Sequence, residues 1–139
     1  MLAANAAEAR LQANNVISVI DDDEDVLIST ASLMESLGFT IETFPSAVFF
    51  LASDTVRRTH CLIADVHMPH MTGLELHYHL RQSGYSIPTI LITAYPDDSV
   101  RNQALDQGVI CYLSKPVEQD QLLECVRSAL ERTKQDRDL

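Results

Sequence analysis

Residues 61–73 read CLIADVHMPHMTG, and the organisation of the whole chain of 139 residues follows from this stretch. It begins with an apolar run, which is typical of a short buried strand when turn signals bound it. Asp65 stands where this predicted strand ends, and Gly73 opens an amphipathic run. In open parallel α/β sheets, ligands bind just outside the carboxyl ends of the strands. We therefore expect the Asp65 side chain to carry the chemistry and the rest of the chain to position it.

Short apolar or β-branched runs on either side of this stretch predict further strands, and amphipathic segments between them predict helices. The expected strands cover residues 16–20, 39–43, 61–64, 87–92 and 109–113; the expected helices cover about 26–37, 45–52, 72–83, 97–107 and 118–132. Strands that alternate with helices over short connections indicate βαβ units. The sequence therefore predicts an α/β fold with a doubly wound, five-stranded parallel sheet. The polar strand at 39–43 suits a sheet edge.

The overall charge and the hydropathy of the chain disfavour several classes of protein. The net charge of −10 disfavours direct binding of nucleic acid, which needs a basic surface to meet phosphates. There is neither an apolar run of about 18 residues to span a membrane nor a secretion signal. We expect a cytoplasmic protein with a flexible leader over 1–15, one domain over 16–132 and a charged, loose tail over 133–139.

The cysteines and histidines do not form a metal-binding pattern. Cys61, Cys111 and Cys125 lack CxxC spacing, and Cys61 and Cys111 lie in apolar runs, so we expect buried, reduced thiols. The histidines in the middle of the chain are predicted to be solvated surface residues rather than transition-metal ligands. They are His67, His70, His77 and His79.

Polar side chains follow four of the five predicted strands. They are Asp21 and Asp22, then Asp65, Thr93 and Lys115. An Asp at a strand end is usually only a turn or capping residue, so no single position is decisive. Because parallel strands end at the same edge of a sheet, however, these groups are expected to converge.

Convergent carboxylates need a cation, because they otherwise raise one another's pKa. A few hard oxygen ligands suit Mg²⁺, which typically takes one or two carboxylates together with phosphate oxygens. An aspartate beside this ion can attack phosphorus and form an acyl phosphate. Phosphoryl transfer mainly requires positioning and neutralisation of charge, which a metal, Lys115 and the Thr93 hydroxyl could provide.

Four motifs make the chain similar to a known family. They are VISVIDDDE at 16–24, ADVHMPHMTGLEL at 64–76, ILITAY at 90–95 and GVICYLSKP at 108–116. Over residues 16–132 the chain resembles the receiver domain of two-component response regulators, close to the FixJ-like branch. The resemblance implies a flavodoxin/CheY-like sheet with strand order 2-1-3-4-5.

The resemblance also implies the roles of the acidic residues. Asp65 would be the phosphoacceptor, and Mg²⁺ or Mn²⁺ would be bound by Asp22 directly, by Asp21 largely through water and by Asp65. The third protein ligand would be the backbone carbonyl of His67. Asp23 and Glu24 are interpreted as charges at the start of a helix, where the helix dipole favours them, and not as ligands.

Further positions match the residues that sense phosphorylation in the family. Thr93 would be the switch hydroxyl, Lys115 the phosphate-sensing lysine and Tyr112 the aromatic side chain that changes rotamer. The bond before Pro116 is expected to be cis. Two positions that tune dephosphorylation in the family carry bulky residues here, His67 and Tyr95.

The resemblance implies a signalling module and not an enzyme. Its partners would be a sensor histidine kinase or a histidine phosphotransfer protein, and phosphorylation would alter the surface formed by residues 97–132, which could support a homodimer. We recognise no output-domain motif in residues 133–139, and we expect either a stand-alone receiver or part of a longer regulator.

Other functions compete with this interpretation. An aspartyl-phosphate hydrolase usually has a second Asp two residues after the first, where this chain has His67. A nucleotide-binding domain would have a Gly-rich first turn, whereas the turn at 21–25 is acidic. A phosphorylation-independent interaction module with the same fold remains an alternative, although the complete set of acidic, hydroxyl and lysine groups argues against it.

Overall fold

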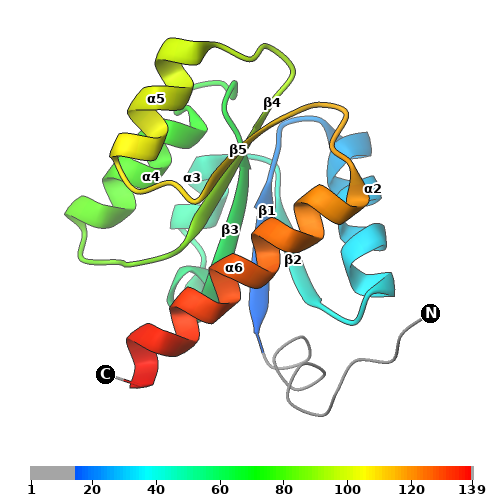
Figure 1. Ribbon diagram of the computed structural model, residues 1–139, viewed down its shortest axis with the longest axis vertical. Coiled ribbons are helices and arrows are strands. Elements are labelled where there is room, and N and C mark those ends of the chain that lie inside the picture. Colours follow the sequence, from blue (N-terminus) through cyan, green and yellow to red (C-terminus); the bar gives the residue numbers. More distant parts are fainter. Residues whose placement is uncertain (1–14, 139) are drawn as a thin grey trace.

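A computed structural model, which describes residues 15–138, contains a single parallel sheet of five strands (Figure 1). The strand order is β2-β1-β3-β4-β5, which confirms the predicted doubly wound topology. The strands are β1 Val16–Ile20, β2 Thr40–Phe44, β3 Thr59–Asp65, β4 Thr89–Thr93 and β5 Cys111–Ser114. The polar strand β2 lies at one edge, as predicted.

Helices cover both faces of this sheet, so that α2 and α6 lie on one face and α3, α4 and α5 on the other (Figure 1). They are α2 Glu24–Ser36, α3 Ala47–Leu51, α4 Gly73–Gln82, α5 Asp98–Asp106 and α6 Gln119–Asp138, with a 3₁₀ helix, η1, at Asp54–Arg58.

Alternation along the central strands divides the core into two apolar clusters. In β3, Cys61 and Ile63 belong to the cluster under α2 and α6, whereas Leu62 and Ala64 belong to the cluster under α3, α4 and α5. Successive side chains of a strand point to opposite faces, so a strand covered on both faces must be apolar throughout. This explains why β3 is buried along its whole length.

Side-chain caps begin four helices, which are α2, α3, α4 and α5. Asp23 accepts from the backbone N–H groups of Asp25 and Val26 at the start of α2, which agrees with its predicted place at the start of a helix. Asp97 caps α5 through the N–H of Val100. Thr72 and Glu75 form a reciprocal capping box at the start of α4. Such caps satisfy N–H groups that have no partner within the helix.

Several predicted boundaries differ from the structure. No helix was predicted between the elements at 45–52 and 61–64, but Asp54–Arg58 form a 3₁₀ helix. The expectation of a loose tail is wrong as far as Asp138, because α6 continues to that residue. The predicted leader, apart from Asn15, lies outside the described residues. Within residues 15–138, no helix has both the length and the apolar character needed to cross a membrane.

The prediction of a reduced Cys111 is wrong, because Cys111 and Cys125 form a disulfide. Cys111 lies in β5 and Cys125 in α6, and both pack with the same apolar cluster. Cys61 is the free cysteine and is fully buried, and burial raises the pKa of its thiol to about 12.

The prediction of solvated histidines holds for His67, His70 and His79, which are exposed, but it is wrong for His77. His77 is buried on α4, with Nδ1 3.1 Å from Thr89 Oγ1 and Nε2 3.1 Å from the carbonyl oxygen of Gln107. Because a carbonyl oxygen only accepts, Nε2 carries the proton of the neutral ring. The side chain therefore joins α4 to β4 and to the end of α5.

Burial lowers the pKa of His77, and the nearby Arg81 charge acts in the same direction, although the bond to Gln107 opposes them. At about pH 6.5 the unfolded chain therefore takes up a proton on this side chain, whereas the folded chain still holds His77 neutral. We expect this residue to make the free energy of unfolding fall as pH drops below about 6.5. In urea titrations, wild type should lose more stability between about pH 7.5 and about pH 5.5 than His77→Gln. An equal loss in both proteins would contradict this.

Candidate functional site

The carboxyl ends of the strands place four charged groups at one rim of the sheet. Asp21 follows β1, Asp65 is the last residue of β3, and Lys115 follows β5. Asp22 lies next to Asp21 in the same connection, before α2 begins. The register explains the arrangement, because Ile20 pairs with Ala64 and Asp65 pairs with Ile92, so that neighbouring strands run out at the same level.

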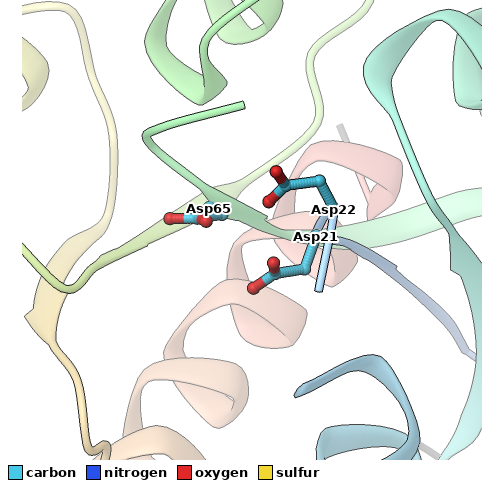
Figure 2. A group of neighbouring side chains, drawn as sticks. All are labelled: Asp21, Asp22 and Asp65. Atoms are coloured by element: carbon cyan, nitrogen blue, oxygen red, sulfur yellow. The ribbon is translucent and has the colours of Figure 1, made fainter. Parts of the chain in front are cut away.

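Three carboxylates gather at this rim, as Figure 2 shows for Asp21, Asp22 and Asp65. One oxygen of each lies within 4.8 Å of the others. Asp21 and Asp65 are buried and Asp22 is exposed, so the cluster opens to solvent on one side. One Asp21 oxygen accepts the backbone N–H of Asp23 at 2.9 Å, which fixes the start of the acidic turn.

Lys115 is the cation that faces the buried carboxylates. Its Nζ is 3.0 Å from Asp21 Oδ2 and 3.5 Å from Asp65 Oδ2. Burial lowers the pKa of Lys115, but the hydrogen bond and charge of Asp21, together with Asp65, outweigh it and leave this pKa above its ordinary value. Burial, followed by the charge of Asp21, raises the pKa of Asp65, although Lys115 and the His67 N–H oppose the rise. Lys115 therefore neutralises only part of the negative charge of the three carboxylates.

These groups surround an open pocket of about 470 Å³. Its lining is mainly acidic and includes one lysine; the residues are Asp21, Asp22, Asp23, Asp65, His67, Ala94, Tyr95 and Lys115. The His67 and Tyr95 rings contact each other edge to face, with centroids 5.7 Å apart, and Tyr95 is 73% exposed. The two bulky side chains thus stand together at this pocket.

Thr93 and Tyr112 lie on the two neighbouring strands β4 and β5. Thr93 ends β4, is fully buried and accepts the backbone N–H of Tyr95 on Oγ1 at 3.0 Å. Tyr112 is partly buried in the apolar cluster under α4 and α5, and its hydroxyl accepts the N–H of Asp97 at 3.2 Å. The peptide bond between Lys115 and Pro116 is cis, in agreement with the expectation from the sequence.

The donor set fits a hard divalent cation. Mg²⁺ prefers oxygen ligands such as carboxylates. The cluster has three carboxylates and only one neighbouring lysine, so negative charge remains for a cation to neutralise. A thiol or an imidazole, which would indicate a softer metal, is absent from the described cluster. The exposed Asp22 leaves one side of the cluster open to solvent.

One contact at the site was not foreseen from the sequence. A Cβ on Gly73 would lie 2.5 Å from the backbone oxygen of Asp65 and 2.9 Å from Leu91 Cδ2. The backbone of α4 therefore approaches the end of β3 so closely that a side chain has no space. A glycine directly after the capping Thr72 was the available signal, because it stands where an ordinary helix former would be expected.

Comparisons with known proteins agree with the geometry. A family profile described as the response regulator receiver domain matches residues 17–127. The chain is 37% identical over 123 residues to the response regulator protein TodT of Pseudomonas putida, and the aligned region covers 88% of this chain and 54% of TodT. It is 32% identical over 115 residues to the transcriptional regulatory protein FixJ of Rhizobium meliloti, and the aligned region covers 83% of this chain and 56% of FixJ.

Solved structures show the same similarity. FixJ-N superposes with a TM-score of 0.76 at 30% identity, over 84% of this chain and 94% of that one. The response regulator StyR superposes with a TM-score of 0.84 at 34% identity, over 91% of this chain and 64% of that one. The chain spans about half the length of the curated relatives it matches. It belongs to the response regulator receiver domains of two-component signalling, with FixJ-like proteins among its relatives.

Proposed function

We propose that Asp65 accepts a phosphoryl group from a phosphohistidine donor, with Mg²⁺ or Mn²⁺ bound at the acidic cluster. The observation that supports this most strongly is the convergence of three carboxylates with one lysine at the carboxyl rim. A buried carboxylate that is poorly neutralised is the group that a metal and a phosphoryl group can both engage.

In the proposed reaction, an oxygen of Asp65 attacks phosphorus in line with the bond to the donor nitrogen. The new O–P bond forms as the P–N bond breaks, and the donor imidazole leaves with the electron pair and takes up a proton from solvent water. Lys115 neutralises one phosphoryl oxygen, and the Thr93 hydroxyl with nearby backbone N–H groups binds another. Asp21, Asp22, Asp65 and the backbone carbonyl of His67 would hold the metal, which would supply charge neutralisation for the transferring group.

The response would follow from these contacts. Thr93 turns towards the phosphoryl group and gives up its present bond to Tyr95, and Tyr112 moves into the space vacated. The surface formed by α5, β5 and α6 then differs between two states, which can regulate a homodimer or an output domain. The chain promotes only its own phosphorylation and dephosphorylation, and we place it in the cytoplasm with its donor.

A groove beside the acidic pocket supports a protein as the donor. It lies between α2 and the β5–α6 connection, and it is mostly apolar. Val26, Leu33 and Pro116 line it, and Lys115 belongs to both the groove and the pocket. A sensor histidine kinase or a histidine phosphotransfer protein seated there would present its phosphohistidine to Asp65.

The test uses a small phosphodonor and intact-mass measurement. The folded chain incubated with acetyl phosphate and Mg²⁺ should gain the mass of one phosphoryl group, and the same mixture with excess EDTA should leave nearly all of it unmodified. An equal gain of phosphoryl mass in both mixtures would show that phosphorylation does not require the metal. No gain in either mixture would overturn the proposed function.

His67 and Tyr95 are expected to lengthen the lifetime of the phosphoryl group. Their rings stand together at the pocket, where they would hinder a water molecule approaching in line. Loss of phosphate from the purified domain should be about tenfold faster in His67→Ala and in Tyr95→Ala, which corresponds to about 1.4 kcal/mol in the barrier. Faster loss in wild type than in both variants would contradict the expectation.

A further inference from the structure

We propose that Cys111 and Cys125 are a reversible thiol–disulfide site that exchanges with low-molecular-weight thiols and disulfides, and that its oxidation restrains the segment carrying Lys115. The inference rests on the proposed function in two respects, which are the placement of the chain in a reducing cytoplasm and the phosphorylation of Asp65 that oxidation is expected to slow. Disulfides there are usually transient and redox-sensing rather than structural.

The backbone already holds the two cysteines at bonding distance. Their Cα atoms are 6.3 Å apart, within the range of disulfides that need no movement of the backbone. Cys111 points to the α6 side of the sheet with Leu113, whereas Tyr112 between them packs with the opposite cluster. Cys125 lies on the buried stripe of α6 beside Leu122 and Val126. Both states therefore fit the same fold.

The three cysteines differ in their access to reagents. Cys111 is partly exposed, Cys125 is nearly buried, and Cys61 is completely buried with its pKa raised by desolvation. Exchange requires an accessible sulfur and a thiolate. An external thiol or disulfide would therefore react at Cys111 first, with Cys125 as the resolving thiol. Cys61 would not react.

Oxidation would act on the phosphoryl site through the segment between the two cysteines. This segment contains Tyr112 and Lys115, and Lys115 Nζ pairs with Asp21 and Asp65. Its far end is fixed because α6 packs against β3 and β4. A covalent link between its ends limits how far Lys115 can leave Asp21 to meet a phosphoryl group. The oxidised chain should therefore favour the unphosphorylated arrangement.

The chemistry balances with a small disulfide such as oxidised glutathione. The Cys111 thiolate attacks one sulfur of the oxidant, displaces one thiolate and forms a mixed disulfide. The Cys125 thiolate then attacks the Cys111 sulfur and displaces the second thiolate. The protein loses two electrons, the oxidant gains them, and the two protons from the cysteines end on the two released thiols.

The first arm of the test counts free thiols without using phosphorylation. The chain is equilibrated in mixtures of reduced and oxidised glutathione, quenched in acid, unfolded and alkylated, and its mass is measured. Excess reduced glutathione should give three alkyl groups, and excess oxidised glutathione should give one, on Cys61. In Cys61→Ala, used as a matched control, the numbers should be two and none. If the number of alkyl groups were the same in every glutathione mixture, the proposed thiol–disulfide site would be overturned.

The second arm measures phosphoryl gain from acetyl phosphate with Mg²⁺. Reduced wild type should be phosphorylated about fivefold faster than oxidised wild type, which is the lower end of typical coupling between sites. The double variant Cys111→Ser, Cys125→Ser should react at the reduced rate in both mixtures. Equal rates in oxidised and reduced wild type would overturn the link to Lys115. If no form gained phosphate, the proposed function would fail while the thiol count still decided the cysteine site.

Discussion

Replacement of Asp65 by Asn is expected to abolish the phosphoryl gain from acetyl phosphate, because an amide oxygen is a poor nucleophile that cannot form the acyl phosphate. The fold should survive. Burial and the Asp21 charge raise the pKa of Asp65, so the ionised side chain is disfavoured where it stands. A neutral amide removes the repulsion, and the thermal midpoint of Asp65→Asn should be no lower than that of wild type.

The matched control for this variant is Asp23→Asn, which makes the same chemical change in the same pocket. Asp23 caps α2 by accepting two backbone N–H groups, and Asn caps helices about as well as Asp. The control should therefore keep its stability and its phosphoryl gain. Gain that persists in Asp65→Asn would show that Asp65 is not the acceptor, and loss in both variants would show that the effect is not specific to position 65.

The rim of the sheet could be predicted from the sequence because one rule decides it. Strands of a parallel sheet end together, so Asp21, Asp65 and Lys115 had to converge once the strands were recognised. Short apolar runs rich in β-branched residues and bounded by turn signals are typical of buried strands, which explains why β1, β3 and β4 were found within about two residues of their bounds. The topology then followed from the resemblance and was confirmed.

The cysteine pair could not be predicted in the same way. Whether Cys111 meets Cys125 depends on which side of β5 faces α6 and on how the helix is rotated, and neither is encoded in local spacing. His77 was missed for a related reason. Its place on the buried side of α4 follows from the helical period, but its partners, Thr89 and the Gln107 carbonyl, come from β4 and the end of α5.

The end of α6 shows the limit of composition as a guide. Residues 133–139 were expected to be loose because they are charged, yet the helix runs to Asp138. Charged residues such as Lys and Arg are good helix formers, and a helix already nucleated by its packed part extends at little cost. Polarity at a chain end therefore predicts exposure better than it predicts irregular structure.

Replacement of Gly73 by Ala is expected to be the most damaging small substitution at the site. The added Cβ would lie 2.5 Å from the backbone oxygen of Asp65, and Leu91 is nearly as close. The backbone cannot simply move aside, since the Gly73 N–H donates to Val66 and the Val66 N–H donates to Ile92. Overpacking of this kind costs about 3 kcal/mol, or about 8 °C in the thermal midpoint. Displacement of Asp65 should also slow phosphorylation by up to about a hundredfold.

The matched control is Gly84→Ala, at the turn that follows α4. Gly84 has a φ of +88° and no atom within 4 Å of an added Cβ, so alanine there meets backbone strain alone, at about 1 kcal/mol. Its phosphorylation rate should equal that of wild type. In Gly73→Ala, the higher helix propensity of alanine would by itself stabilise α4, so a loss of stability must come from the contact with β3. If Gly73→Ala were no less stable than Gly84→Ala and were phosphorylated at the wild-type rate, the approach of α4 to Asp65 would not position the carboxylate.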